Sequence, residues 1–275
     1  MELGVHLPLM EFGSEGQSLA RLQATVDAAR DCGFAAISAN DHFVFSTPWL
    51  DGPTALAAAV ERSAGLSLAT TVALVSLRGP MQLARTLAAL DVLSGGRLVA
   101  GVGPGSSKRD YDAVGVPYED RWKRFEQAVT MLRDLLPGGI PLWIGSWGSA
   151  AGLRRVARLA DGWLASAYNT TPERFAAARE LLADGFPNAL ATMWTWVTED
   201  RAERDRVLRD VVAPLLNRDL DELRGRLCIG SAEWCAELLS RYARAGCDRV
   251  YLWPIGDEPR QLELVATRVA PRIER

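Results

Sequence analysis

The sequence predicts an α/β fold of the (β/α)8 barrel class, and three observations support this. Short apolar runs alternate with helical patterns along the whole chain, which gives eight strand-then-helix units. The runs are apolar throughout instead of alternating, as expected for parallel strands that helices cover on both faces. The chain has 275 residues, close to the roughly 250 residues typical of such a barrel. A doubly wound open sheet is the rival fold, but it usually contains fewer strands.

The predicted strands are apolar runs that end at turn residues. The helices between them are recognised by residues spaced three and four apart or by caps. Thr171, Pro172 and Glu173, for example, supply an N-cap, a first-turn proline and an acid that favours the helix dipole. The strands cover residues 3–8, 34–39, 66–74, 98–102, 142–144, 163–165, 190–197 and 250–253. The helices lie around residues 19–29, before 61, at 80–92, around 122–132, from 149, from 172, around 207–215, from 231 and at 261–270.

Composition excludes several classes of function. The 31 Lys and Arg residues nearly balance the 34 Asp and Glu residues, and no basic stripe suggests a nucleic-acid footprint. The four cysteines include no CxxC pair and only two histidines are present, so no metal site is predicted and the thiols are expected to be reduced. The longest mostly apolar stretch without charge, residues 63–77, is too short to span a bilayer. We therefore expect a cytoplasmic protein without nucleic-acid or membrane partners, with residues 1–275 forming a single domain.

In such a barrel, reactive groups lie on the loops that follow the strands. The second strand is followed by Asn40, Asp41, His42 and Phe43. A carboxylate beside an imidazole can form a general acid/base or orienting pair. Neighbours on an extended chain point in opposite directions, however, so Asp41 need not contact His42, and a plain Asx turn is the alternative. His42 is the one well-placed histidine candidate, because His6 lies inside the first strand.

Small residues follow the fourth and fifth strands. Residues 101–106 nearly match the dinucleotide-binding fingerprint but end in Ser106 instead of glycine. They form either a tight turn or a loop that lets a flat or phosphorylated ligand approach the backbone. Residues 145–149 precede a helix, whose free N–H groups and positive dipole end suit a phosphate. An ordinary N-cap at Ser149 is the alternative.

The remaining candidates are aromatic. Three tryptophans belong to the end of the barrel where the strands finish, and two lie along the seventh predicted strand; they serve either as core or as the wall of a pocket. Strand-end glutamate pairs, a nucleophile elbow and a metal-ligand set are all missing from the sequence. One histidine, a glycine loop and a candidate phosphate site therefore suit an enzyme whose cofactor supplies the reactivity. The five tryptophans are Trp49, Trp147, Trp194, Trp196 and Trp253.

At these residues the sequence resembles the bacterial-luciferase-like family of flavin- and F420-dependent oxidoreductases, nearly from end to end. The family fold is a luciferase-like TIM barrel, in agreement with the strand count. The two longest matching segments carry most of the specificity. The matching segments are residues 33–34 with 41–43, 68–72, 83–105 (LARTLAALDVLSGGRLVAGVGPG), 141–164 (PLWIGSWGSAAGLRRVARLADGWL) and 245–248.

The resemblance implies specific roles. His42 would lie beside the central ring of the cofactor as a proton donor or stabiliser, with Asp41 next to it, and both are expected to be catalytic. A non-prolyl cis peptide between Thr71 and Val72 would back the ring, and residues 146–149 would hold the phosphate. The cofactor-binding residues are then Asn40, Thr71, Val72, Gly103, Gly105, Ser106, Gly145, Ser146, Trp147, Gly148 and Ser149.

The sequence departs from the family pattern in two places. Ser106 stands where F420-dependent members often have a carboxylate. The chain also passes from Leu136 to Pro141 without the long insertion that helps to cover the substrate in relatives. We therefore expect a more open site, or one covered by residues 46–53 and 106–117.

The expected function is hydride transfer between reduced coenzyme F420 and a small organic substrate. An FMN-dependent monooxygenase and a flavin-binding barrel without catalysis are the alternatives. F420 is favoured by the Asp-His pair and by the arginine-rich composition, typical of a GC-rich genome, in which only Lys108 and Lys123 are lysines. Dimers are common in the family, so the resemblance also implies a homodimer.

Overall fold

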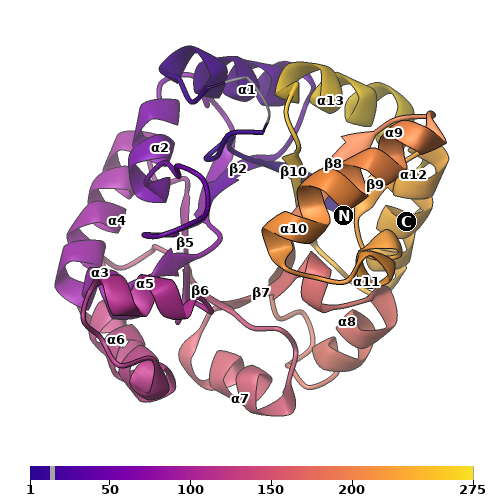
Figure 1. The fold of residues 1–275 in the computed structure, drawn as a ribbon. Coiled ribbons are helices and arrows are strands. Elements are labelled where there is room, and N and C mark those ends of the chain that lie inside the picture. The colour runs from indigo at the N-terminus through magenta and orange to yellow at the C-terminus, as the bar shows by residue number, and fades with distance from the viewer. Residues whose placement is uncertain (13–15, 275) are drawn as a thin grey trace.

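The chain folds as a closed parallel barrel. The computed structural model describes residues 1–12 and 16–274. Successive strands pair in chain order, and the last barrel strand pairs with the first and with β8 (Figure 1). The predicted (β/α)8 barrel is therefore confirmed. Its strands are β1 (Glu2–His6), β2 (Ala36–Ala39), β3 (Ser67–Thr70), β5 (Leu98–Gly103), β6 (Leu142–Gly145), β7 (Gly162–Ser166), β8 (Asn188–Val197) and β10 (Arg249–Pro254).

Helices surround the barrel, and most of them begin where the sequence supplies a cap or a proline. Ser18, Asp51, Ser149, Thr171 and Ser231 each accept a hydrogen bond from the first turn of a helix. The outer helices are α1 (Leu19–Asp31), α2 (Gly52–Ala59), α4 (Pro80–Ser94), α6 (Arg121–Leu135), α7 (Ala150–Leu159), α8 (Pro172–Arg179), α12 (Ala232–Arg244) and α13 (Glu258–Leu264). None of the helices in the described part of the chain is long and apolar enough to cross a membrane.

Shorter elements differ from the prediction. The third strand, expected to run from 66 to 74, is divided into β3 and β4 (Ala73–Leu74) around a cis peptide bond between Thr71 and Val72. β9 (Cys228–Gly230) pairs with β8 and was not predicted, because three residues carry too little periodicity. The other short helices are α3 (Val75–Arg78), α5 (Lys108–Ala113), η1 (Tyr118–Asp120), η2 (Ala167–Asn169), α9 (Arg201–Arg206), η3 (Val207–Val212), α10 (Ala213–Leu216), α11 (Leu220–Arg224), η4 (Val265–Val269) and η5 (Ala270–Arg272).

Large rings fill the barrel interior near the start of the strands. Glycine makes room for them: a Cβ on Gly162 would lie 2.3 Å from the Trp143 ring, and one on Gly4 would lie 2.7 Å from Tyr251. This packing closes the interior, so a ligand site has to lie at the carboxyl ends of the strands. The buried interior cluster consists of Ala36, Ala69, Leu164, Ala189 and Tyr251, with Val72, Val99 and Trp143 packed against it.

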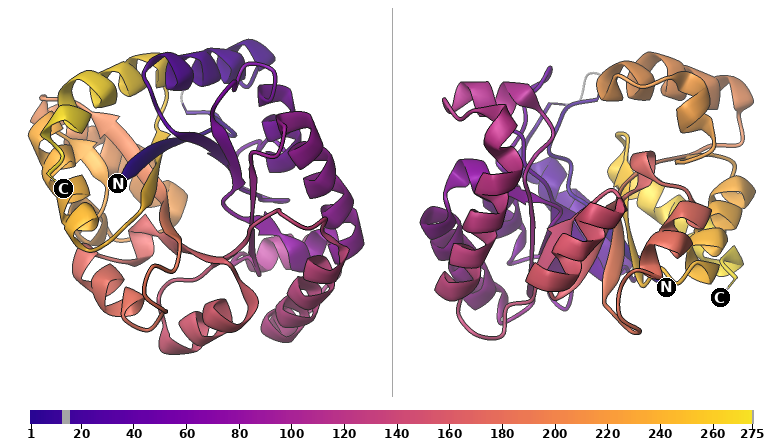
Figure 2. Two further views of the ribbon diagram at one scale, coloured as in Figure 1. Left: turned by 180° about the vertical axis from the view of Figure 1, so that it is seen from behind. Right: turned by 90° about the horizontal axis from the view of Figure 1, so that it is seen from below.

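Segments on two sides of the barrel extend beyond the carboxyl ends of the strands. The stretch from α9 to α11 follows β8, and α5 with η1 follows β5. In the right-hand view of Figure 2, the first stretch (orange) and the second (magenta) rise on opposite sides of the barrel.

Candidate functional site

A cavity of about 340 Å³ opens at the carboxyl ends of the strands. All but one of the predicted site residues line it; the exception is Gly148. Ser166 and Thr192 also line it, as do Tyr118, Arg121 and Trp122. The lining residues that the sequence predicted are Asn40, Asp41, His42, Thr71, Val72, Gly103, Gly105, Ser106, Gly145, Ser146, Trp147 and Ser149.

His42 is held at this wall by Asp110. Its Nδ1 lies 2.9 Å from Asp110 Oδ2, and Asp110 Oδ1 accepts hydrogen bonds from the backbone N–H groups of Phe43 and Val44 at 2.9 and 2.8 Å. Burial raises the pKa of Asp110, but the bonds from His42 and the two amides outweigh burial, so the pKa lies below its ordinary value. An ionised carboxylate only accepts, so Nδ1 of His42 is the donor and Nε2 is free to exchange a proton with a ligand.

Asp41 is not the partner of His42. Its carboxylate accepts two hydrogen bonds from Arg78, at 2.6 and 2.7 Å, and one from the backbone N–H of Leu74 at 3.1 Å. Arg78 also pairs with Asp51. The expected neighbour pair is thus replaced by two separate pairs, as the alternation of side chains along extended backbone allows. Asp41 fixes the loop that carries His42 to the segment after β4.

The predicted cis peptide between Thr71 and Val72 is present. The glycines opposite it leave room for the Val72 side chain: a Cβ on Gly103 would lie 2.6 Å from Val72 Cγ2, and one on Gly145 would lie 3.1 Å from Cγ1. Together these residues form a smooth wall of the cavity. The buried Oγ1 of Thr71 and Oδ1 of Asn40 have no hydrogen-bond partner within the described residues. Because buried polar atoms are normally paired, a flat ligand with polar edges fits this wall.

The far side of the cavity is suited to an anion. Ser149 caps α7 by accepting a hydrogen bond from Gly152 N at 3.2 Å, and Ser146 Oγ accepts one from Gly148 N at 3.4 Å. Both hydroxyl protons therefore stay available beside the positive end of this helix. Gly148 thus supports Ser146 from behind the cavity surface.

Arg121 supplies a positive charge to the same cavity. Its guanidinium lies 4.1 Å from the ring centre of Tyr118 and donates to the Tyr118 carbonyl at 3.1 Å. The Tyr118 hydroxyl in turn donates to the carbonyl of Ser106 at 3.1 Å. Within the described residues no carboxylate forms an ion pair with Arg121. A held, unpaired guanidinium at a cavity wall suits a phosphate or carboxylate.

The sequence profile described as luciferase-like monooxygenase matches residues 1–212, well over half of the chain. The chain belongs to the luciferase-like monooxygenase family. The fold agrees with this assignment, since two solved structures of similar fold cover it almost completely. One is an F420-dependent secondary alcohol dehydrogenase in complex with an F420-acetone adduct (TM-score 0.84, 16% identity, 100% of this chain and 99% of that one). The other is the monooxygenase RslO1 from Streptomyces bottropensis (TM-score 0.83, 19% identity, 100% of both chains).

A curated relative matches part of the chain. It is the 5,10-methylenetetrahydromethanopterin reductase of Archaeoglobus fulgidus, 30% identical over 132 residues, which are 40% of this chain and 39% of the relative. The match thus spans about two fifths of that relative's length. The two solved structures share the fold of this chain, and the archaeal relative shares sequence with part of it.

The sequence alone did not single out Asp110 or Arg121. Asp110 stands in a run of charged residues after the glycine loop, which reads as a solvent-exposed stretch, yet α5 buries Asp110 and Tyr111 against the luciferase-like barrel. Arg121 stands at the start of α6, where it is one of many arginines. A carboxylate within a few residues of a strand-end glycine loop is the one local signal that could have identified Asp110.

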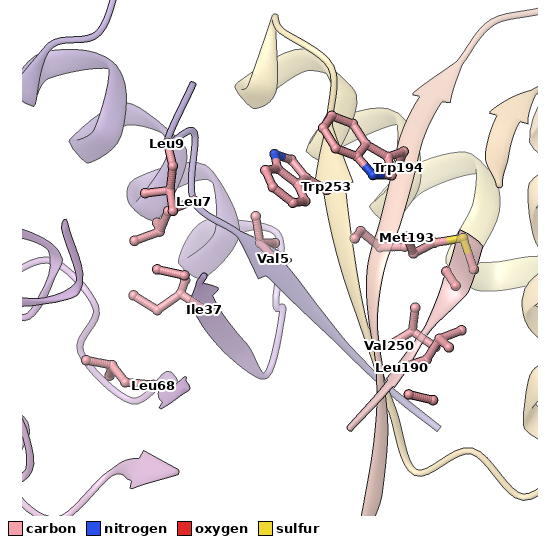
Figure 3. Packing of buried hydrophobic residues seen from close by; sticks show 14 of the residues in the cluster. Val5, Leu7, Leu9, Ile37, Leu68, Leu190, Met193, Trp194, Val250 and Trp253 are labelled. Atoms are coloured by element: carbon pink, nitrogen blue, oxygen red, sulfur yellow. The ribbon is translucent and has the colours of Figure 1, made fainter. Parts of the chain in front are cut away.

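The tryptophans separate into two groups. Trp147 lines the cavity and is 57% exposed. Trp194 and Trp253 are buried and stack with ring centres 4.3 Å apart, and Trp49 meets Trp253 edge-on at 5.8 Å. Figure 3 shows Trp194 on β8 facing Trp253 on β10. The pocket-wall interpretation thus holds for Trp147, and the core interpretation holds for the stacked pair.

The two loops expected to cover the site behave differently. Of the expected loop 106–117 only Ser106 lines the cavity, and no residue of 46–53 does. Tyr118, Arg121 and Trp122, just beyond the first loop, line the cavity instead. Trp49 of that second loop instead contacts His42, with ring centres 4.7 Å apart. The loop after β5 therefore forms part of the cavity wall, and the loop after β2 packs behind His42.

Proposed function

We propose that this luciferase-like barrel is an F420-dependent oxidoreductase that transfers a hydride between reduced F420 and a small organic substrate. The observation that carries the proposal is the His42–Asp110 pair at the wall of a cavity that offers almost no other acid or base. The lining carboxylate of Asp41 is bound by Arg78. A cavity with one poised imidazole and smooth glycine walls suits a cofactor that brings the reactivity. Residues 1–275 would act as one cytoplasmic domain on a small-molecule substrate.

The cofactor would occupy the cavity in two parts. Its ring would lie against Val72, Gly103 and Gly105, with Asn40, Thr71 and Ser106 offering polar atoms at its edge. Its phosphate would lie between the start of α7 and Arg121. The second group of ligands consists of Gly145, Ser146, Trp147 and Ser149, with Gly148 behind them.

A bound deazaflavin would supply hydride transfer at its central ring. His42 handles the proton at Nε2: it gives a proton to a carbonyl oxygen when the substrate is reduced, or takes one from a hydroxyl when the substrate is oxidised. Asp110 stabilises the protonated imidazole, since its carboxylate lies on Nδ1. Asp41, predicted as catalytic, contributes by fixing the loop that carries His42.

The second candidate is an FMN-dependent monooxygenase. It is favoured by the family profile, which is that of monooxygenases, and by Ser106 in the place of a carboxylate. The Asp41-His42 sequence motif and the arginine-rich composition favour F420. The residues around the ring and the phosphate suit either cofactor, so the choice has to be made by measurement.

Spectroscopic titration tests the proposal. Purified protein is titrated with F420 and, separately, with FMN, and the absorbance and fluorescence of each cofactor are recorded. We expect saturable binding of F420 that is tighter than that of FMN. Tighter binding of FMN would favour the monooxygenase, and failure to bind either cofactor would reject both functions.

Replacing His42 by Ala separates catalysis from binding. General acid–base catalysis contributes about 10²–10⁴-fold, so we expect a loss of this size in turnover with simple ketones and alcohols, and a cofactor affinity within about twofold of wild type. His42→Gln, which keeps a polar side chain, is the matched variant. If neither wild type nor variant reduces or oxidises any compound while both bind cofactor, the barrel is a binding protein.

A further inference from the structure

Two hydroxyl groups, one on the last residue of β7 and one within β8, have not been assigned a role. Ser166 Oγ and Thr192 Oγ1 lie 3.0 Å apart, and both residues line the cavity. Thr192 has φ of 59°, in the left-handed region where β-branched residues are rare. Strained backbone of this kind persists where the surrounding structure holds it, and it concentrates at ligand-binding sites.

The hydrogen bonds around this pair have a fixed direction. Arg218, on the stretch that follows β8, donates to Asn169 Oδ1. A guanidinium has only donors, so this contact fixes the orientation of the Asn169 amide. Asn169 Nδ2 must then donate to Ser166 Oγ, at 3.1 Å. On the other side, the backbone N–H of Ala167 donates to Thr192 Oγ1 at 3.2 Å.

The hydroxyl protons of Ser166 and Thr192 are not all used within the chain. The two hydroxyl oxygens already accept bonds from Asn169 and Ala167, and one hydroxyl proton lies between them. The second proton has no acceptor within the pair, whichever oxygen carries it. Tyr168 lines the cavity beside them; burial raises the pKa of its phenol, while a hydrogen bond with Ser166 opposes the rise. The phenol keeps its proton, so three hydroxyl protons serve two contacts, Ser166–Thr192 and Ser166–Tyr168. One O–H donor is therefore left at the cavity wall.

We propose that the Ser166–Thr192 pair donates this hydrogen bond to a neutral carbonyl oxygen of the molecule in the cavity. The carbonyl belongs either to the cofactor ring or to the substrate, so the inference rests on the proposed function. A phosphate is a poorer match, because the unpaired cation and the helix terminus that suit an anion belong to α6 and α7. Arg218 does not supply charge to the ligand, since it is bonded to Asn169 and lies 3.6 Å from Glu222.

The amide of Asn169 determines that the pair acts as a donor. An aspartate at position 169 would accept from Arg218 and also from Ser166. Ser166 Oγ would then accept from Thr192, and both hydroxyl protons would be used inside the chain. Asn169→Asp should therefore remove the donor from the cavity without touching either hydroxyl group, which a merely structural role of the pair would not predict.

The test combines Asn169→Asp and four hydroxyl variants with one control. Thr192→Val and Ser166→Ala each leave one hydroxyl, the double variant leaves none, and Thr192→Ser keeps the donor if the strained backbone does not tolerate valine. Thr195→Val is the control: it lies on the same strand, is buried, and its hydroxyl donates to the Met193 carbonyl at 2.8 Å. Each protein is titrated with F420 and FMN, and the infrared carbonyl bands of the bound cofactor are recorded. Cyclohexanone is then added to the cofactor-loaded protein as a carbonyl probe.

Loss of one hydrogen bond corresponds to roughly a two- to tenfold loss of affinity. If the cofactor carbonyl is the acceptor, the double variant and Asn169→Asp bind cofactor that much more weakly and its carbonyl band moves to higher frequency. If the substrate carbonyl is the acceptor, cofactor binding is unchanged and cyclohexanone binds more weakly. Thr192→Ser and Thr195→Val should match wild type in both cases.

Two results would overturn the inference, and they differ from each other. A wild-type protein that binds neither cofactor rejects the proposed function and the inference together. A wild-type protein that binds cofactor, with the double variant and Asn169→Asp unchanged in cofactor affinity, carbonyl band and cyclohexanone affinity, rejects the inference alone.

Discussion

The two histidines of this chain lie in two contrasting parts of the barrel mouth. Around His42, the ends of β5, β6 and β7 carry small residues, and a cavity opens between them. Around His6, the ends of β1, β8 and β10 carry large rings: His6 stacks on Trp253 with ring centres 3.6 Å apart, and Trp253 stacks on Trp194. We call these the open part and the closed part of the mouth.

A histidine side chain has a different environment in each of the two parts. His6 is fully buried; burial lowers its pKa from 6.5 to about 3, against smaller opposing effects of the Leu7 carbonyl and Asn40. It therefore stays neutral and serves packing. His42 has an ionised carboxylate on Nδ1 and a cavity beside it. A strand-end histidine is thus made reactive by its partner and its access to a ligand, and not by its place in the barrel.

The largest effect, on the free energy of unfolding, is expected when a large ring is removed from the closed part. Trp253→Ala should lower the free energy of unfolding by about 3–5 kcal/mol, the usual cost of truncating a buried aromatic residue. Cofactor affinity of the folded protein should stay within about twofold. Trp147→Ala is the matched control in the open part, and it should weaken cofactor binding with little change in stability. Urea unfolding and cofactor titration measure the two quantities. If Trp253→Ala mainly weakened cofactor binding, the division between the two parts would be wrong.

The next effect concerns the partner that makes His42 reactive. Asp110→Asn should reduce turnover about 10–100-fold, a part of the 10²–10⁴-fold that a general acid or base contributes, because the imidazole loses its fixed tautomer and the charge that stabilises its protonated form. Cofactor affinity should change little. Asp112→Asn serves as control, because Asp112 lies on the same short helix and forms an exposed ion pair with Lys108. A pH–rate profile is the decisive measurement: its shape should change in Asp110→Asn and stay that of wild type in Asp112→Asn.

The His42–Asp110 pair shows which features of the site can be predicted from the sequence. The barrel follows from apolar runs and caps, and the glycine loops and the start of α7 mark part of the cavity; these are local features. Asn40, Thr71 and Val72 were expected only from the family resemblance. The partner of His42 lies 68 residues away along the chain, and only the closed barrel brings α5 to the loop after β2. Side-chain alternation showed that Asp41 need not touch His42, but it gave no information about which carboxylate would.

The donor pair of Ser166 and Thr192 was harder to foresee. A serine at the end of a strand and a threonine within one are ordinary residues, and the left-handed φ of Thr192 leaves no mark in the sequence. Gly103 and Gly145 could be predicted because glycine itself signals a close approach of atoms. Residues whose role depends on the direction of a hydrogen bond become recognisable only when their partners are placed.

The closed part should also make the free energy of unfolding depend on pH. Because the folded-state pKa of His6 lies below its unfolded value, unfolded chains bind a proton that folded chains do not, and stability falls as the pH is lowered from 6.5 towards 3. The slope approaches about 1.4 kcal/mol per pH unit for this one group. His6→Phe keeps a flat ring on Trp253 but cannot titrate. Urea unfolding at several pH values should therefore show a shallower decline for His6→Phe than for wild type, by about 2 kcal/mol between pH 6.5 and 5. Equal slopes would mean that His6 is not buried in its neutral form.

The smallest expected effect concerns the open part. It tests whether Arg121 contacts the phosphate or the ring of the cofactor. A charge-assisted hydrogen bond is worth about 1.5–3 kcal/mol, and Arg121 is partly exposed, so solvent reduces this value. We expect Arg121→Ala to weaken FMN binding about tenfold, at the lower end of that range. Riboflavin lacks the phosphate, so its affinity should be nearly unchanged, and the loss for FMN should shrink as salt is added. Arg124→Ala, an exposed arginine one turn further along α6, is the control. Equal losses for FMN and riboflavin would place Arg121 at the ring instead of the phosphate, and the anion site would then depend on Ser146, Ser149 and the helix terminus alone.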